Sequence, residues 1–251
     1  MEKENNQSDL VFGIRPLIEA IEAGKQIDNV FIQDGLRGEL INDLKRMMQK
    51  RGIIYKQVPV EKINRITHKN HQGVIGFVSP VSFYRLEDII TSVFEAGKSP
   101  LILILDRITD VRNFGAIARS AACAGVDAIV IPSRGASPIN SDALKTSAGA
   151  LYSMPICKEH NLKSAIDYLK DSGLQIMAVT EKASDLYYQA DFSGPAALIM
   201  GSEEDGISPE YLKLADARIR IPIQGQIGSL NVSVATGIVL FEAAKQRLSI
   251  Q

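Results

Sequence analysis

The stretch Leu101-Ile-Leu-Ile-Leu105 (LILIL) decides the fold class. A continuous aliphatic run of this length is typical of a strand that is buried on both faces of a parallel sheet. Similar runs return at 128–131 (AIVI), 176–179 (IMAV), 196–200 (AALIM) and 218–221. Helical patterns separate them, at 113–124, 140–150, 161–172, 208–215 and 231–247. Strands that alternate with helices predict an α/β domain with a mostly parallel sheet and helices on both sides.

A smaller alternation precedes this one. Helical patterns lie at 15–23, 39–50 and 59–66, and extended patterns lie at 29–33, 53–58 and 73–78. They predict a compact N-terminal α/β domain. We therefore expect a disordered polar tail at 1–9, a small domain at 10–79, a linker with one short helix at 80–99, and the main domain at 100–251.

Composition excludes several classes of protein. The 251 residues, 45% hydrophobic and 23% charged, are ordinary for one large or two small globular domains. The longest aliphatic run has five residues, far below the ~18 of a membrane span. The start, MEKENNQSD, has no signal-peptide pattern. Cys123 and Cys157 are too few for a disulfide framework and suggest reduced thiols, so a cytoplasmic location with no membrane partner is expected.

The charge distribution is uneven although the net charge is only −1. The window 45–71 carries eight basic residues, two histidines and a single acid, Glu61. Such clustering is typical of a phosphate-binding face. A solvated helix face is the alternative interpretation, and charge alone does not decide between them.

Common catalytic and metal motifs are missing. The chain has no G-x-G pair, no G-x-S-x-G elbow and no His/Cys spacing for zinc, so no metal site is predicted. Gly73-Val-Ile-Gly76 could form the clamp loop of a KH module, but a strand is the better interpretation. Glu203-Glu204-Asp205 lacks the ligand spacing of a calcium loop, and a solvated turn is favoured.

Three polar segments each follow a strand of the second alternation. In the first, 106–121, Asn113 is a good N-cap, and Arg119 is the one charge among the small residues of the helix that follows. In the second, 199–207, Gly201 suits a tight turn or a ligand close to the backbone. In the third, 221–235, Ser229 or Asn231 caps the last helix. Ligands of open α/β sheets bind beyond the carboxyl ends of the strands, so the three segments are expected to form one site.

The last helix, 232–244, is apolar nearly all round. Such a helix must be covered on all sides. A partner subunit is the expected second cover, and burial of a strand or helix centrally within one chain is the alternative.

At these residues the chain resembles the SpoU, or TrmH-like, branch of the SPOUT RNA methyltransferases. The resemblance rests on three ordered motifs, DRITDVRNFGAIARSA, IMGSEEDGIS and IPIQGQIGSLNVSVATGIVLFEA. It extends through the N-terminal part, from VFGIRPLIEAI to HQGVIGFV, and so covers 10–247. The full-length layout is similar to that of bacterial enzymes that 2′-O-methylate a guanosine of large-subunit (23S) rRNA.

The resemblance implies a trefoil-knotted C-terminal domain, S-adenosylmethionine as cofactor, and a homodimer through that domain, including its last helix. It also implies an N-terminal domain like ribosomal protein L30e, with RNA rather than DNA as partner. The implied catalytic residues are Arg119, Asn113, Glu203, Ser229 and Asn231. The implied cofactor-binding residues are Thr180, Met200, Gly201, Ile221, Gln226, Ser229 and Leu230. The basic window then becomes an RNA face, with Lys45, Arg46, Lys50, Arg51, Lys69 and His71, joined by Arg112.

The roles expected from this resemblance can be stated residue by residue. The family's mechanism makes Arg119 the general base. Because a guanidinium stays protonated, the alternative is that Arg119 holds the flanking phosphate and stabilises the developing alkoxide, while another acceptor or water takes the proton. Asn113 would fix the ribose or Arg119, and Glu203 would accept backbone N–H groups of its loop. Ser229 and Asn231 would order the cofactor loop.

Simple helix capping is the alternative for Asn113 and Asn231. A tRNA methyltransferase of the same family and a non-catalytic rRNA assembly factor stay open as alternative functions. The modified nucleotide is not encoded in these motifs.

Overall fold

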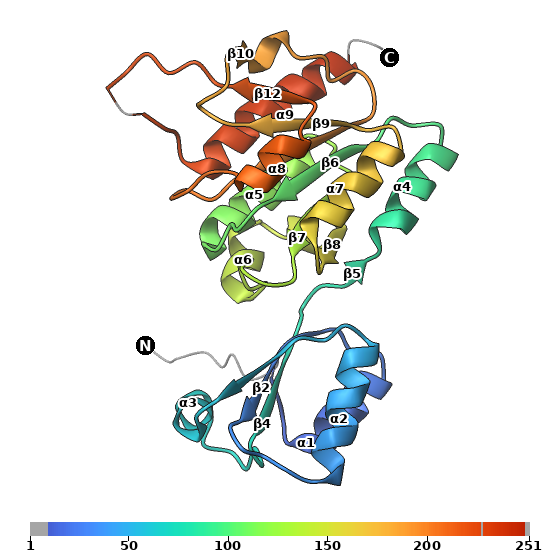
Figure 1. Ribbon diagram of the computed structural model, residues 1–251, viewed down its shortest axis with the longest axis vertical. Coiled ribbons are helices and arrows are strands. Elements are labelled where there is room, and N and C mark those ends of the chain that lie inside the picture. Colours follow the sequence, from blue (N-terminus) through green and yellow to red (C-terminus); the bar gives the residue numbers. More distant parts are fainter. Residues whose placement is uncertain (1–9, 227, 249–251) are drawn as a thin grey trace. The chain divides into compact units, whose positions relative to one another are not determined.

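A computed structural model gives the structure of residues 10–226 and 228–248 (Figure 1). The tail expected to be disordered, 1–9, lies outside these residues. The chain divides between Ser82 and Phe83 into two compact units, which we describe separately. No helix of the described residues is long and apolar enough to cross a membrane.

The first unit is a four-stranded mixed sheet with helices on both faces. Its sheet order is β1-β4-β2-β3, with β2 and β3 parallel and the other pairs antiparallel. The elements are β1 (Leu10–Phe12), α1 (Ile14–Glu22), β2 (Ile27–Gln33), α2 (Glu39–Lys50), β3 (Tyr55–Val58), α3 (Val60–Ile66) and β4 (Val74–Val78).

The two faces of this sheet are covered unequally. On one face Val30, Ile32 and Val74 are fully buried against α1 and α2. On the other face the short helix α3 is the only described helix of this unit that packs, with Ile63 buried against Ile75. The second face therefore keeps partly exposed apolar side chains.

The second unit is an eight-stranded sheet in which every pairing among the described residues is parallel, as expected. Its order is β10-β12-β9-β11-β6-β7-β8-β5. The strands are β5 (Phe83–Tyr84), β6 (Leu101–Leu105), β7 (Ala128–Pro132), β8 (Ile156–Glu159), β9 (Gln175–Val179), β10 (Asp185–Leu186), β11 (Ala196–Met200) and β12 (Ala217–Arg220). The helices are α4 (Leu86–Glu95), α5 (Val111–Cys123), α6 (Ser141–Thr146), η1 (Ala150–Tyr152), α7 (Leu162–Asp171), η2 (Tyr187–Gln189), α8 (Pro209–Leu214) and α9 (Val232–Leu248).

Helices cover both faces of the large sheet. α4, α7 and α8 pack on the face that carries Ile102, Ile104 and Ile199. Side chains alternate along a strand, so Leu101, Leu103 and Leu105 face the opposite side, and all three are buried. α5 lies on that side and packs against both α6 and α9 (Figure 1). The strand buried on both faces that LILIL predicts is confirmed.

The segment expected as a linker, 80–99, belongs largely to the second unit. β5 extends the large sheet by pairing with β8, and α4 buries Leu86 and Ile90 in the core below that sheet. The expected connector is therefore structured because its helix has an apolar face that the sheet covers. The short strands β1, β5, β8 and β10 were not predicted, and only two of the four residues of β8 are buried.

The last helix, α9, is covered on one side only by the residues that the structure describes. Val232, Thr236, Val239, Leu240 and Ala243 are buried. In contrast, Val234 is 51%, Phe241 53% and Leu248 69% exposed. The alternative of a segment buried centrally within one chain is therefore wrong.

Candidate active site

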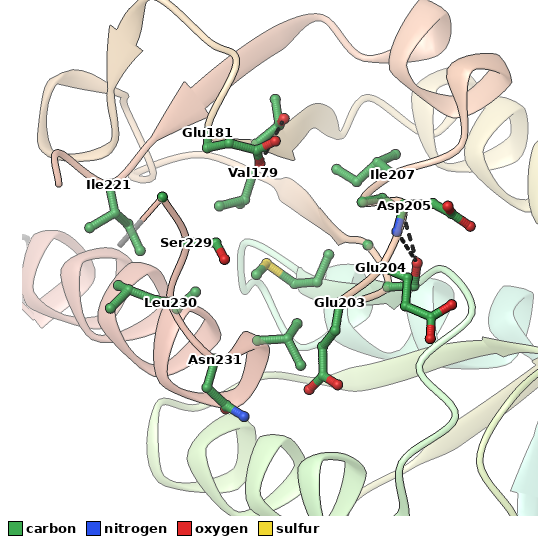
Figure 2. A pocket seen from close by; sticks show the side chains of 18 of the residues that line it. Val179, Glu181, Glu203, Glu204, Asp205, Ile207, Ile221, Ser229, Leu230 and Asn231 are labelled. Carbon is green, nitrogen blue, oxygen red and sulfur yellow. Dashed lines mark hydrogen bonds between the residues drawn. The ribbon is translucent and has the colours of Figure 1, made fainter. Parts of the chain in front are cut away.

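A cavity of about 650 Å³ opens at the carboxyl ends of β9, β11 and β12 (Figure 2). Its walls come from the ends of these strands, from the loop that follows β11, and from the start of α9. The lining residues are Asn113, Val179, Thr180, Glu181, Lys182, Met200 to Ile207, Ile221, Ile223, Gly228 to Val232 and Ala235. The cavity thus lies at the edge of the sheet where the rule for parallel strands predicts a ligand site.

The loop after β11 folds back tightly on itself. A Cβ atom on Gly201 would lie 2.1 Å from the carbonyl carbon of Gly206, so only glycine fits at 201. Ser202 N donates to Gly206 O at 3.1 Å, and Gly206 N donates to Ser202 O at 2.9 Å. Asp205 N donates to Ser202 Oγ at 3.2 Å. Gly201 is therefore required by a tight turn of the chain itself.

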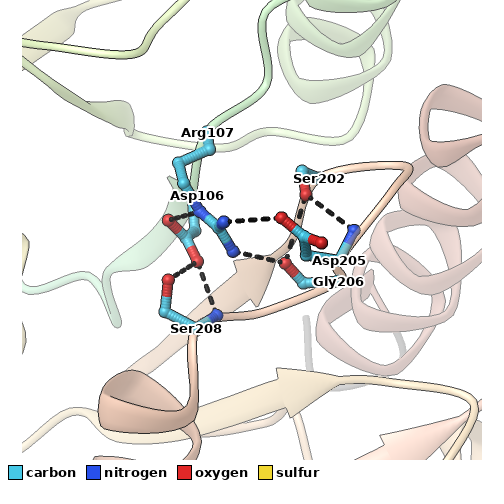
Figure 3. Close-up of polar contacts among 6 residues, drawn as sticks. All are labelled: Asp106, Arg107, Ser202, Asp205, Gly206 and Ser208. Atoms are coloured by element: carbon cyan, nitrogen blue, oxygen red, sulfur yellow. Dashed lines mark hydrogen bonds and ion pairs between the residues drawn. The ribbon is translucent and has the colours of Figure 1, made fainter.

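A buried aspartate holds the base of this loop (Figure 3). Asp106 directly follows β6, and its side chain is only 3% exposed. Both the backbone N and the Oγ of Ser208 donate to Asp106 Oδ2, at 2.7 and 2.6 Å. The end of β6 is thereby joined to the start of α8. These bonds satisfy the buried carboxylate on one side.

Arg107 also joins the end of β6 to this loop, through three hydrogen bonds from its guanidinium. Its Nε donates to Asp106 Oδ1 at 3.1 Å, its Nη1 to Asp205 Oδ2 at 3.0 Å, and its Nη2 to Gly206 O at 3.1 Å. The hydrogen bond to Asp106 raises the pKa of the Arg107 guanidinium above its ordinary value, so its charge is secure. We call Asp106, Arg107, Asp205 and Gly206 the loop clamp.

The backbone of Arg107 adopts a left-handed conformation, with φ of 58°. This conformation costs a non-glycine residue on the order of 1 kcal/mol. Three hydrogen bonds from one guanidinium, two of them to carboxylates, offset that cost. The loop clamp therefore keeps the arginine in a strained backbone position.

Three of the residues predicted to be catalytic form one hydrogen-bonded chain in the cavity wall. Asn113 Nδ2 donates to Glu203 Oε1, and Asn231 Nδ2 donates to Asn113 Oδ1 at 3.0 Å. Asn231 Oδ1 in turn accepts from Ser233 N at 2.9 Å and Ser233 Oγ at 2.6 Å. Residues from three distant segments are thus linked, and we call Asn113, Glu203 and Asn231 the polar relay.

The relay corrects two expectations. The N-cap of α5 is Asp110, not Asn113, because Asp110 Oδ1 accepts from Asn113 N at 2.8 Å. The Asn113 side chain is therefore released for the cavity. Glu203 accepts from a side chain and not from the backbone N–H groups of its loop, where Ser202 is the acceptor instead. Of the two caps expected for α9, Ser229 or Asn231, the structure shows Asn231, whose Oδ1 accepts from the backbone N of Ser233 and Val234.

Most of the predicted cofactor residues line the cavity. They are Thr180, Met200, Gly201, Ile221, Ser229 and Leu230, whereas exposed Gln226 is not among the lining residues. Sequence reasoning missed Glu181 and Lys182, which follow Thr180 at the end of β9. Their position after a buried strand was the signal that could have found them.

Arg119 lies away from the cavity in this chain. It is exposed on α5 and is not a lining residue. Asn113 and Arg119 are six residues apart on one helix, so their side chains point in directions about 120° apart. The chain alone does not bring Arg119 to the polar relay.

The predicted RNA residues lie on different surfaces. Lys45, Arg46 and Lys50 belong to α2, and Arg51 follows it. Lys69 and His71 precede β4, where Lys69 Nζ lies 5.2 Å from the ring centre of Phe12 on the other face of the sheet. His71 holds its loop by accepting from Gly73 N at 3.0 Å. Arg112 is exposed in the first turn of α5, in the second unit.

The cavity wall is acidic. Glu181, Glu203, Glu204 and Asp205 line it, whereas Lys182 is the one cation among its described lining residues, and Arg107 binds Asp205. Val179, Ile221 and Leu230 supply apolar surface. A cavity with this lining suits a ligand that combines a positive charge with a flat apolar group.

Comparison with known proteins follows the division into two units. The SpoU rRNA Methylase family matches residues 100–241, and the family described as RNA 2′-O ribose methyltransferase substrate binding matches residues 10–84. An uncharacterized tRNA/rRNA methyltransferase of Synechocystis sp. is 35% identical over 98% of this chain, which spans 65% of that relative.

A relative along its whole length and a solved structure agree with this match. The 23S rRNA (guanosine-2′-O-)-methyltransferase RlmB of Vibrio parahaemolyticus is 32% identical, over 96% of this chain and 98% of its own. The crystal structure of an AdoMet-bound rRNA methyltransferase from Sinorhizobium meliloti superposes with a TM-score of 0.61 at 28% identity. That comparison covers 94% of this chain and 87% of the other.

Proposed function

Because the chain belongs to the SpoU rRNA Methylase family, we propose that it transfers a methyl group from S-adenosylmethionine to a ribose 2′-hydroxyl of RNA. The observation that carries this proposal is the polar relay. It joins three residues of the three family motifs at the wall of a cavity large enough for the cofactor.

The cavity fits the cofactor chemically. S-adenosylmethionine supplies an electrophilic methyl group on a positively charged sulfur. Glu181, Glu203 and Glu204 give the wall a negative field that favours such a cation. Val179, Ile221 and Leu230 offer apolar surface for an adenine ring.

In the reaction, the 2′-oxygen bonds the methyl carbon as the bond from that carbon to sulfur breaks, and the hydroxyl proton leaves to a base. A ribose hydroxyl is a weak nucleophile, so orientation is the main contribution that we assign to the protein. Asn113 is held at both ends of its amide, by Glu203 and by Asn231, and is therefore preorganised to orient the ribose. The candidate bases for the hydroxyl proton are the carboxylates that line the cavity, Glu181, Glu203 and Glu204.

Although Arg119 lies away from the cavity of its own chain, we assign it to the phosphate that flanks the reacting ribose, where its planar guanidinium can bind two oxygens. Replacement by lysine removes that geometry while keeping the charge. We expect Arg119→Lys to lose most of the turnover while cofactor binding is kept. Turnover like that of the wild type would remove Arg119 from the site.

We also propose that two copies of the chain pair through α9. Val234, Phe241 and Leu248 repeat every seventh residue and form one exposed apolar stripe. An exposed stripe of this kind on a helix marks a protein interface. Pairing would supply the second cover expected for this helix. We also propose that the second unit contains the trefoil knot that the family resemblance implies.

Large-subunit rRNA is the substrate that we favour, with a guanosine as target, in the cytoplasm. The Vibrio relative supports this choice because it matches this chain along its whole length, including the N-terminal unit. A tRNA substrate is the second candidate, since the Synechocystis relative is named for both RNAs.

The test is transfer of a radiolabelled methyl group from S-adenosylmethionine to unmodified 23S rRNA and, separately, to unmodified tRNA. Digestion of the product then identifies the labelled nucleotide. We expect 2′-O-methylguanosine in 23S rRNA. Label in tRNA alone would keep the reaction and refute the substrate. Absence of S-adenosylmethionine binding would refute the proposal that this chain is a methyltransferase.

A further inference from the structure

The N-terminal unit has a cluster of aromatic rings on the face of its sheet that α3 covers only in part. Phe12 on β1 and Phe31 on β2 lie opposite Ile75 of the strand between them, β4. Phe77 lies two residues further along β4, so all three rings share this face. The rings of Phe31 and Phe77 meet edge to face, with centroids 5.1 Å apart. Ile75 is fully buried, whereas the three phenylalanines are only half-buried.

Lysines surround these rings. Lys62 Nζ lies 5.1 Å from the ring centre of Phe31, and Lys69 Nζ lies 5.2 Å from that of Phe12. Lys56 is exposed and pairs in register with Phe31, which places it on the same face. Lys62 and Lys69 are exposed and the three phenylalanines are only half-buried, so part of this surface faces solvent. The opposite face of the sheet is closed by α1 and α2.

We propose that Phe12, Phe31 and Phe77, with Lys56, Lys62 and Lys69, form a platform for single-stranded RNA. Unpaired bases would stack on the rings, and the lysines would turn to the phosphates. This inference rests on the proposed function, because it names the surface that captures the RNA substrate. It places the main RNA contact on the sheet and not on the basic residues of α2.

Physical chemistry favours single strands on such a surface. A base stacked on an aromatic side chain strengthens binding roughly tenfold. A lysine over an exposed ring contributes less, so a base can replace it there. The released lysine then faces a phosphate, and the positive charge of the 45–71 window complements the backbone. A duplex keeps its bases stacked internally and cannot use the rings.

The α2 residues offer a matched control surface. Arg46 is paired with Asp43 on the same helix, and Arg51 Nη1 donates to Ile21 O at 2.8 Å. Lys45 lies over Tyr55, on the face of the sheet opposite to the platform. These residues carry the same charge without a shared aromatic surface. If the platform substitutions reduce RNA affinity more than the α2 substitutions do, the difference cannot come from positive charge alone.

The experiment measures the affinity of the full chain for a short single-stranded oligoribonucleotide and for a duplex of the same sequence, by fluorescence anisotropy. Phe12→Leu, Phe31→Leu and Phe77→Leu keep the apolar volume and remove the flat ring. We expect each to weaken single-strand binding roughly three- to tenfold. The platform triple of Lys56→Gln, Lys62→Gln and Lys69→Gln should reduce the salt slope by up to about 2.

Four further measurements make the outcome decisive. The α2 triple of Lys45→Gln, Arg46→Gln and Lys50→Gln should change affinity less than threefold. Binding of S-adenosylmethionine by calorimetry should be unchanged in every variant, which shows that the second unit is intact. Circular dichroism of each leucine variant reports whether the N-terminal unit is folded. RNA substituted with 4-thiouridine should crosslink to peptides that contain the three phenylalanines.

The outcomes separate the platform from the proposed function. Unchanged RNA affinity in the folded platform variants, or duplex binding as tight as single-strand binding, overturns the platform and leaves the methyltransferase standing. A larger loss from the α2 triple overturns it as well. Failure of the wild type to methylate any RNA, with single-strand binding still lost in the platform variants, overturns the proposed function and supports the platform.

Discussion

Arg107→Gly is the substitution that tests the loop clamp most directly. Glycine accepts the left-handed backbone at 107 without strain, so this change removes the guanidinium and leaves the backbone path intact. The loop that carries Glu203 then loses its contacts with Arg107 and keeps only the two bonds from Ser208 to Asp106 at the end of β6. We expect a less stable second unit and weaker cofactor binding.

The structure sets the size of the effect. The Asp106 carboxylate is 3% exposed and loses one charged hydrogen bond, which is worth roughly 1.5–3 kcal/mol. The Asp205 carboxylate is 70% exposed, so its ion pair contributes about 0–1 kcal/mol. Relief of backbone strain returns on the order of 1 kcal/mol. The free energy of unfolding should therefore fall by about 0.5–3 kcal/mol.

The assay combines urea unfolding with cofactor calorimetry and steady-state kinetics. A loosened loop must be ordered again on binding, so we expect the Kd and KM for S-adenosylmethionine to rise roughly three- to tenfold, with a smaller change in kcat. Asp205→Asn, which weakens only the exposed contact, is the matched control and should cost less than about 1 kcal/mol. If Arg107→Gly is as stable as the wild type and binds the cofactor equally well, strain relief outweighs the clamp and our account of this arginine is wrong.

Three further predictions concern single positions. Asp110→Ala should cost about 1 kcal/mol of stability through loss of the α5 cap and keep kcat, whereas Asn113→Ala should lose turnover at nearly unchanged melting temperature. If Asn113→Ala lowers stability as much as Asp110→Ala does and keeps kcat, Asn113 has a capping role instead. Gly201→Ala forces a Cβ into the backbone of its own loop and should abolish cofactor binding in calorimetry, whereas Gly194→Ala, with nothing within 4 Å, should be silent; tight binding by the first variant contradicts the turn geometry. Burial above all raises the pKa of the Glu159 carboxyl, so its ionisation opposes folding and Glu159→Gln should raise the free energy of unfolding at pH 7. That gain should shrink as the pH falls through the ordinary glutamate range near 4.3, and a gain that persists in acid excludes this cause.

The large sheet was predictable because its central strands are apolar along their whole length. LILIL and AALIM pair in register, and both are buried on two faces. The strand β8 has the sequence ICKE, in which only Ile156 and Cys157 are buried, so its pattern is too short to detect. Strands of two residues, such as β5, have no period at all and depend entirely on their neighbours.

The edge of the sheet that holds the site was also predictable, but not the contacts within it. Asp110 and Asn113 are equally good caps by residue type, and only the start of α5 at Val111 decides between them. The pairing of Arg107 with Asp205 joins residues 98 positions apart, and no local pattern encodes it. Charge clustering found the basic window, but the division of its residues between two faces of a sheet follows from strand register.

The double use of Asn231 restricts how this chain tolerates insertions. The oxygen of its side-chain amide caps α9 by accepting from Ser233 N, and the nitrogen of the same amide donates to Asn113 Oδ1. Added residues between Asn231 and Val232 would rotate the helix by about 100° each and break one of these two bonds. Loop length can vary only ahead of Asn231. A library of insertions across 222–236 should therefore keep function on the upstream side and lose it abruptly at the asparagine.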